Sequence, residues 1–154
     1  MTTPNASKGI RDWMYSTSFE DISPEVRRFA ILAMYDAIGG DLACSLLPVA
    51  HRMVDFVNIL GGAPDCSMIG FPVRTSALNA ALVHGTLGHA DEVDPVGGDM
   101  GAHIMAATMG AALAVGQLAG ASGQEVVRSV ILGSELARRV QRVAAQSRGG
   151  GNSL

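Results

Sequence analysis

The sequence is poor in charged and in aromatic residues. Only 16% of its 154 residues are charged and 5% are aromatic, and 11 Lys and Arg against 14 Asp and Glu give a formal net charge of −3. A protein that binds nucleic acid needs positive charge to neutralise the phosphate backbone. The composition therefore predicts no nucleic-acid partner.

Cysteine is also scarce, and its placement carries no motif. Cys44 and Cys66 lie 22 residues apart, without the Cys-x-x-Cys spacing. No segment resembles a signal peptide. This usage is typical of a protein in a reducing compartment, so we expect a cytoplasmic location.

Long apolar runs are absent except for one, at residues 104–121. It has 18 residues, the minimum length for a membrane span, and Gln117 is its only strongly polar member. The run lacks bulky side chains, basic flanks and an aromatic belt. We therefore expect a buried core helix here and no membrane contact.

The hydrophobic pattern predicts one all-α domain, a compact bundle of about six helices. The length suffices for one domain with a core and is too short for two. Helical spacing or capping residues mark segments at 7–16, 24–40, 46–60, 76–92, 103–121 and 124–146. We expect a disordered lead-in over residues 1–6, a single helical domain over 7–146 and a flexible tail over 147–154.

Capping signals support three of these helices. Ser23 precedes Pro24, Thr75 or Ser76 precedes the fourth helix, and Ser122 with Glu125 forms a Ser-x-x-Glu box. The glycines at 39–40 predict the end of the second helix. Between the third and fourth helices we expect a loop, with at most a short extended piece at 66–69.

Most residues that can carry out chemistry lie in residues 79–103, NAALVHGTLGHADEVDPVGGDMGAH. At 100° per residue, small side chains share one narrow face of the predicted helix, which Glu92 continues. A second helix can approach that face closely, and the run that follows His103 offers matching small residues. The small residues are Ala77, Ala81, Gly85 and Gly88 on the first helix, and Ala106, Gly110 and Ala114 on the second.

The segment NAALVHGTLGHADEVDP resembles the signature of the MmgE/PrpD family, whose members include 2-methylcitrate dehydratase and cis-aconitate decarboxylase. In that family a run of the type NGxxAHxxDFDDT is followed by HPS. Other segments are similar as well, among them ISPEVRRFAILAMYDAIGG and LAGASGQEVVRSVILGSELARRV. The resemblance implies an all-helical domain built around an active site that works without metal or cofactor.

The resemblance also assigns positions. Glu92 matches the first aspartate of the DFDD run, Asp94 matches the second, and His103 matches the histidine of the HPS run. Pro95 replaces the third aspartate and Val96 replaces the threonine. Family members complete the site with a second histidine, with lysines and with an α+β lid domain, all of which follow the last helix of this chain.

From the residues themselves we expect Glu92 and His103 to form an acid/base pair. Burial, nearby like charge and the negative end of a helix would all raise the pKa of Glu92. His103 opens a helix, whose positive end favours neutral imidazole. The alternative for Glu92 is an acid that faces solvent at a helix end, and the alternative for His103 is a helix-terminal residue without catalytic use.

Further candidates complete the predicted site. We expect His89 to hold the carboxylate of Glu92, Asp94 to assist in catalysis, and His84 to be a packing histidine. A metal site formed by His84, His89, Glu92 and His103 has no recognised zinc spacing, so no metal is expected. The predicted substrate-binding residues are Asn79, Val96, Gly97 and Gly98.

Two classes of function fit these observations. The first is a cofactor-independent lyase or isomerase that abstracts a proton beside a carbonyl or carboxylate of a small molecule, as a dehydratase, decarboxylase or cyclase does. The second is a non-catalytic or split-enzyme helical subunit, which the replacements Pro95 and Val96 favour. With 48% hydrophobic residues, either class predicts a homodimer, a larger assembly or a complementing partner chain.

Overall fold

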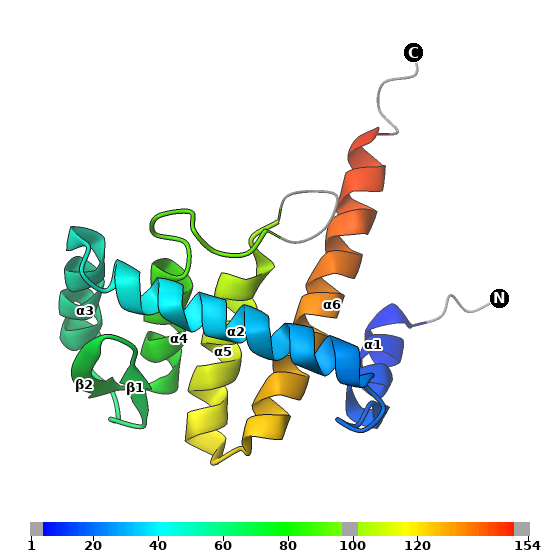
Figure 1. Cartoon of the computed structure of the whole chain (residues 1–154), viewed down its shortest axis with the longest axis horizontal. Coiled ribbons are helices and arrows are strands. Elements are labelled where there is room, and N and C mark those ends of the chain that lie inside the picture. The colour runs from blue at the N-terminus through cyan, green and yellow to red at the C-terminus, as the bar shows by residue number, and fades with distance from the viewer. Residues whose placement is uncertain (1–4, 97–101, 150–154) are drawn as a thin grey trace.

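The computed structural model describes residues 5–96 and 102–149 of the chain. Six helices and one two-stranded hairpin make up this part, so the predicted all-α class is confirmed. In chain order the elements are α1 (Ala6–Ser16), α2 (Pro24–Cys44), α3 (Pro48–Leu60), β1 (Cys66–Met68), β2 (Phe71–Thr75), α4 (Ala77–Leu87), α5 (Ile104–Ala119) and α6 (Gly123–Gly149), as Figure 1 shows.

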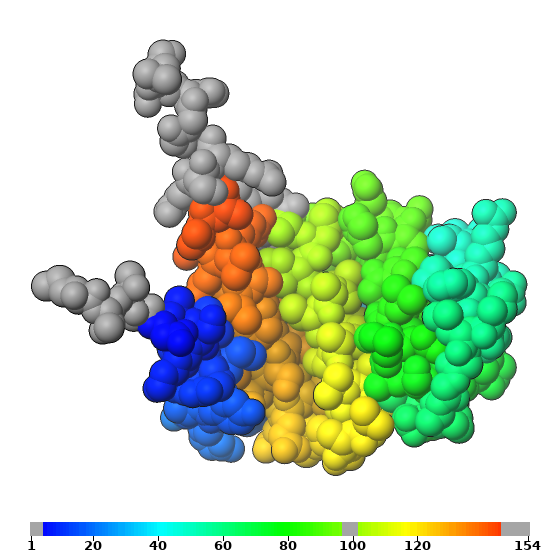
Figure 2. Space-filling model, turned by 180° about the vertical axis from the view of Figure 1, so that it is seen from behind, coloured from blue at the N-terminus to red at the C-terminus, as the bar shows by residue number. Residues whose placement is uncertain are grey.

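The helices form two layers. One layer contains α3, α4, α5 and α6 in that order across the molecule, and α2 lies across α4, α5 and α6 as the other layer (Figure 1). From behind, α4, α5 and α6 lie side by side, with α1 against α6 at one end and α3 at the other (Figure 2). The site discussed below lies where α4 ends and α5 begins.

Glycine and alanine let α4 and α5 pack closely against each other. A methyl group added to Gly110 would lie 3.1 Å from the backbone nitrogen of Gly85 and 3.1 Å from Cβ of His84. A methyl group on Gly88 would lie 2.9 Å from Cβ of Ala106. The predicted close approach through small residues is therefore confirmed, and it brings the end of α4 against the first turn of α5.

The predicted caps are confirmed. The Ser23 hydroxyl accepts a hydrogen bond from the backbone N–H of Val26, at 3.3 Å, and Ser76 is the N-cap of α4. At the start of α6, the backbone N–H of Ser122 donates to the Glu125 carboxylate at 2.7 Å, and the Glu125 N–H donates back to the serine hydroxyl at 3.3 Å. These bonds satisfy backbone groups that a helix end leaves open.

The predicted end of α2 at the glycine pair is wrong. The helix continues through Gly39 and Gly40 to Cys44, because its last turn carries two buried side chains, Asp41 and Cys44, into the core. The Asp41 carboxylate pairs with Nδ1 of His84 at 3.0 Å. A long-range contact thus outweighs the low helix propensity of glycine.

The loop between α3 and α4 contains more regular structure than expected. The short extended piece is present as β1, and β2 pairs with it antiparallel, with Cys66 opposite Thr75. Gly70 connects the strands with a φ of 81°, and a methyl group on it would lie 2.3 Å from Cβ of Ser45. Only glycine suits this turn.

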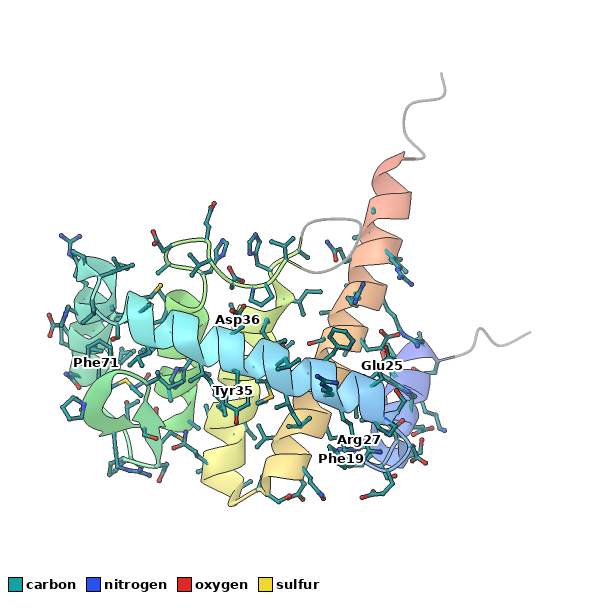
Figure 3. The ribbon with its side chains drawn as sticks, in the orientation of Figure 1. Phe19, Glu25, Arg27, Tyr35, Asp36 and Phe71 are labelled. Carbon is teal, nitrogen blue, oxygen red and sulfur yellow. The ribbon has the colours of Figure 1, made fainter. Side chains whose placement is uncertain are left out.

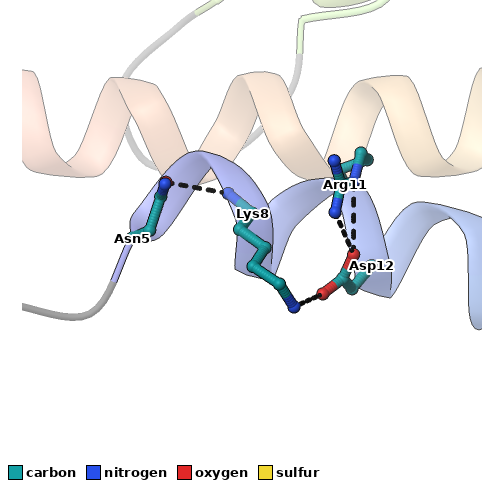
Figure 4. Close-up of polar contacts among 4 residues, drawn as sticks. All are labelled: Asn5, Lys8, Arg11 and Asp12. Atoms are coloured by element: carbon teal, nitrogen blue, oxygen red, sulfur yellow. Dashed lines mark hydrogen bonds and ion pairs between the residues drawn. The ribbon is translucent and has the colours of Figure 1, made fainter.

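The first helix is attached to the last by polar contacts. Nε of Arg128 donates to the backbone carbonyl of Thr17 at 2.6 Å, and the same guanidinium also reaches Met14 O. At the outer face of α1, Asn5 caps the helix and Lys8 pairs with Asp12 (Figure 4). The ion pair lies within α1 and is exposed, so it contributes little to stability, whereas the Arg128 contacts join α1 to α6.

Within residues 5–96 and 102–149, no single helix combines the length and apolar character that a membrane crossing requires. Taken together, α2 and α3 have sufficient length and apolar character, but the chain bends by 88° between them.

We predict that Gly110→Leu lowers the stability of the domain. Leucine is a good helix former, so any loss must come from overpacking between α4 and α5, which costs about 1–3 kcal/mol. Gly39→Leu is the matched control, because Gly39 is an exposed helical position with no atom within 4 Å of an added methyl group. Urea unfolding of both variants checks the prediction, and an equal or greater midpoint for Gly110→Leu would contradict it.

Candidate functional site

The site lies on the segment that follows α4. The helix ends at Leu87 with Gly88 as its C-cap, and irregular chain follows it up to residue 96. His103 is the N-cap residue of α5 and makes no side-chain capping bond there. Because Gly88 lies against Ala106, the chain leaving α4 and the chain entering α5 come together.

Three side chains meet at this point, and we call them the His–Asp–His cluster: His89, Asp94 and His103. Nδ1 of His89 lies 3.0 Å from Oδ1 of Asp94, and Nδ1 of His103 lies 2.9 Å from the same oxygen. The two imidazole rings are tilted by 52° with centroids 4.3 Å apart. One carboxylate oxygen therefore holds both histidines.

Burial differs sharply within the cluster. The Asp94 side chain is 2% exposed, whereas the side chains of His89 and His103 are 45% and 31% exposed. The carboxylate thus lies beneath the two rings, and the rings lie toward solvent. Among the residues that the structure describes, Oδ2 of Asp94 has no hydrogen-bond partner.

The contacts shift the ionisation of two members of the cluster. Burial alone would raise the pKa of Asp94, but the hydrogen bonds from His89 and His103 outweigh it, so the pKa lies below its usual value. The hydrogen bond to Asp94 raises the pKa of His89 above its ordinary value, with smaller support from the charges of Asp94 and Glu92. The cluster therefore favours a carboxylate beside an imidazolium.

The geometry also assigns the histidine tautomers. A carboxylate only accepts hydrogen bonds, so each Nδ1 that faces Oδ1 of Asp94 carries its proton. In neutral imidazole the lone pair is then on Nε2. Neither His89 nor His103 has an Nε2 partner among the described residues. Each ring can accept or donate a proton through that nitrogen.

A second carboxylate–imidazole pair lies in the core. His84 and Asp41 are 1% and 0% exposed, and Nε2 of His84 lies 3.4 Å from the backbone carbonyl of Ser67. Burial raises the pKa of Asp41, which the hydrogen bond from His84 only partly offsets. His84 is thus buried in the core, as predicted for a packing histidine, and its partner Asp41 is new.

The predicted role of His89 and the predicted burial of Glu92 do not match the structure. Glu92 is exposed, with a positive φ of 51°, because the helix ends at Leu87 and cannot carry its face that far. His89 accordingly bonds to Asp94 and not to Glu92. The structure brings together His89, Asp94 and His103.

One further predicted residue, Asn79, lies apart from the cluster. Asn79 is buried in the first turn of α4, where its amide donates to the carbonyl of Gly61 at 2.8 Å and to the Thr75 hydroxyl at 3.1 Å. It lies more than two helical turns from His89, so it supports the end of α3 instead of the site. Val96 is exposed, and Gly97 and Gly98 are outside the described residues.

Sequence reasoning missed Asp41 altogether. It is a single acid between two glycines and an apolar run, AIGGDLAC, and an isolated acid in such a context was the available signal. Asp94 was predicted as a site residue, but its contact with both histidines was not. That contact depends on how the chain turns between the end of α4 and the start of α5.

The rings of the cluster are partly open to solvent, since the side chains of His89 and His103 are 45% and 31% exposed. A hollow of about 520 Å³ between α5 and α6 is lined mainly by alanine and glycine, together with Thr108, Glu125 and Ser129. It contains none of the three cluster residues. In the described part of the chain, the cluster lies at the surface over a buried carboxylate.

A helical domain with a carboxylate–imidazole cluster at a helix junction is suited to acid–base chemistry on a small molecule. A family model described as the MmgE/PrpD N-terminal domain matches residues 8–152, and the chain belongs to this family. The family includes lyase-type enzymes. Comparisons with curated proteins and with solved structures return no match.

We predict that the cluster stabilises the fold only within a window of pH. The folded-state pKa of His89 is raised, so its contribution is complete below about pH 6.5 and is lost as the pH rises through the raised value. The pKa of Asp94 is lowered, so its contribution is complete above about pH 4 and is lost on further acidification.

Asp94→Asn should therefore cost most stability between about pH 4 and pH 6.5 and progressively less outside that range. Urea unfolding as a function of pH measures this difference. In the variant, NMR titration should give a pKa of His89 that is closer to its ordinary value, because the raising contact with Asp94 is lost. A stability difference that does not vary with pH would contradict the assignment.

Proposed function

We propose that this domain provides the acid–base centre of a cofactor-independent lyase or isomerase. The reaction begins with removal of a proton from a carbon next to a carbonyl or carboxylate group. One observation carries the proposal: a single buried carboxylate, Asp94, holds two partly exposed imidazoles through Nδ1 and leaves Nε2 of each without a partner among the described residues. Such a pair supplies a base and an acid side by side.

The cluster suggests a division of roles. Neutral His103 accepts the carbon-bound proton at Nε2, and the electron pair left on carbon is delocalised into the adjacent carbonyl group. His89, whose pKa is raised by Asp94, serves as the imidazolium that protonates a leaving hydroxyl group, which departs as water. A double bond forms, and the two rings then exchange protons with solvent.

The other predicted residues receive secondary roles in this proposal. In place of the predicted acid role, Glu92 contributes negative charge, which favours the imidazolium form of His89. Val96, which is exposed beside the cluster, offers an apolar contact for the substrate. Asp94 orients both rings and does not take up the substrate proton.

The surroundings favour a substrate of low negative charge. Asp91 and Glu92 are exposed in the same segment as His89, so an approaching polyanion meets like charge. Arg139 is occupied, because Nε pairs with Glu135 at 2.8 Å and the guanidinium stacks over Trp13. A monocarboxylate or an uncharged carbonyl compound suits this site better than a tricarboxylate.

We propose that self-association or a complementing partner chain covers the exposed rings of His89 and His103. Large apolar side chains are exposed along α2, among them Phe29 at 65%, Leu32 at 52% and Tyr35 at 71%. Figure 3 labels Tyr35 and Asp36 on opposite edges of α2, with Glu25 toward the other end of the helix. Exposed apolar patches of this kind indicate protein contacts.

We predict that the wild-type protein exchanges or eliminates carbon-bound protons of small carbonyl and carboxylate compounds. The protein is incubated in D2O and EDTA with the monocarboxylate 3-hydroxybutyrate, and loss of Cα–H signals or the appearance of vinyl protons is followed by NMR. The tricarboxylates 2-methylcitrate and cis-aconitate are the comparison compounds and should react more slowly, because Asp91 and Glu92 repel them. His103→Gln should lower the rate by about 10²-fold or more, the usual contribution of a positioned base.

His51→Gln is the matched control for this experiment. His51 is exposed on α3, and its ring forms a T-shaped pair with the ring of Phe71, with centroids 5.6 Å apart; Figure 3 labels Phe71. Its substitution should leave the rate unchanged. Equal turnover in wild type, His89→Gln and His103→Gln would exclude the cluster as the acid–base centre. No turnover in any protein would favour a non-catalytic subunit.

We also predict that the exposed α2 surface mediates self-association. Replacing Phe29 and Tyr35 together with serine should shift the protein from dimer to monomer in light scattering after size exclusion, since the pair removes much of the exposed apolar area. Tyr15→Ser, at an 84% exposed position on α1, is the control. An unchanged mass for the double variant would locate the contact elsewhere.

A further inference from the structure

The His–Asp–His cluster combines ligand types that transition metals favour. One potential ligand atom from each of His89, Asp94 and His103 lies within 4.8 Å of the other two. Two imidazoles and one carboxylate form the ligand set of many mononuclear metal sites with open positions. This set differs from the one considered from the sequence, because Asp94 takes part and His84 and Glu92 do not.

We propose that these three residues bind a divalent first-row transition-metal ion of the Zn²⁺ or Co²⁺ type. The ligands are Nδ1 of His89, Nδ1 of His103 and Oδ1 of Asp94, and water fills the positions on the solvent side. The ion takes the place of the protons that the two rings share with the carboxylate. This site goes beyond the proposed function and does not depend on it.

The distances are close to those that such an ion requires. Nitrogen and oxygen ligands lie about 2.1 Å from Zn²⁺, so two ligands at the tetrahedral angle are about 3.4 Å apart. The two nitrogen–oxygen distances in the cluster are 3.0 and 2.9 Å. A small outward movement of Asp94 and the exposed rings would admit the ion, without repacking α4 against α5.

Charge and burial provide an independent argument. Asp94 is 2% exposed on its side chain, and its Oδ2 has no hydrogen-bond partner among the described residues. An unpaired buried carboxylate oxygen is costly, and a nearby cation compensates for that cost. Asp91 and Glu92 add negative charge in the same segment. The buried anion is thus poised to attract a cation from the solvent side.

Metal binding would change the chemistry of both rings. A metal on Nδ1 requires the proton of neutral imidazole to be on Nε2, so the outward nitrogen changes from an acceptor to a donor. A histidine in that state cannot accept a proton from carbon. The ion therefore acts as an inhibitor of the acid–base reaction, and a chelator reverses the effect.

The test uses the full chain without a histidine tag. Co²⁺ is added at pH 7.5 and its visible absorption is followed, and Zn²⁺ is then added as a competitor. We expect one Co²⁺ per chain, displacement by Zn²⁺, and weaker binding as the pH falls, because protons compete for the histidines. His89→Gln and His103→Gln should each weaken binding at least tenfold, since loss of even an outer partner costs roughly 10–100-fold.

His51→Gln is the control and should bind Co²⁺ as the wild type does. Circular dichroism checks that each variant is folded, and His89, at 45% exposure, is the substitution that disturbs the core least. In nitrogen-15 NMR, Zn²⁺ should move the proton of both cluster rings to Nε2. Absence of saturable Co²⁺ binding, or equal affinity in both cluster variants and wild type, would overturn the proposal.

The outcomes separate this proposal from the proposed function. Turnover is measured in EDTA, so activity there with no metal binding would overturn only the metal site. Metal binding without turnover in EDTA would overturn only the acid–base role. Activity in EDTA that Zn²⁺ suppresses in wild type, with the same Zn²⁺ dependence in His51→Gln, would support both.

Discussion

The close approach of α4 and α5 determines where every polar group of the site lies. Gly110 faces the backbone of Gly85 and Gly88 faces Ala106, so the two helices approach without room for an added methyl group at either point. A larger residue at these positions would displace the first turn of α5 and His103 with it. The 2.9 Å contact between His103 and Asp94 thus depends on glycines that have no chemistry of their own.

The His84–Asp41 and His89–Asp94 pairs contain the same chemical groups, but burial gives the first a structural role and leaves the second accessible. His84 lies in α4 and His89 lies just after its end, and each bonds through Nδ1 to an aspartate. The first pair is sealed and fixes the last turn of α2 against α4. The second leaves its rings partly in solvent, so protons, a substrate or an ion can reach them. Only the open pair is suited to chemistry, although both bury a carboxylate.

The fold was more predictable from the sequence than the site. Caps such as Ser23 and Ser76, and the small faces of α4 and α5, are local patterns that packing reinforces. Glu92 was misplaced because helical periodicity was extended past Leu87, where the helix has ended and the chain turns through a positive φ. Asp41 offered a local signal as an isolated acid, but its pairing with His84 could not be found, because it joins positions 43 residues apart. Contacts of that range depend on topology, which local patterns do not encode.

The replacement of an aspartate by Pro95 fits this view of the site. A third acid after Glu92 and Asp94 would add repulsion beside a carboxylate that is already buried. Proline instead removes that charge, and it restricts the residue before it, Asp94, to extended backbone conformations. A restricted backbone reduces the freedom lost when Asp94 is held beneath the two histidines. The departure from the family signature therefore rigidifies the one carboxylate on which both imidazoles depend.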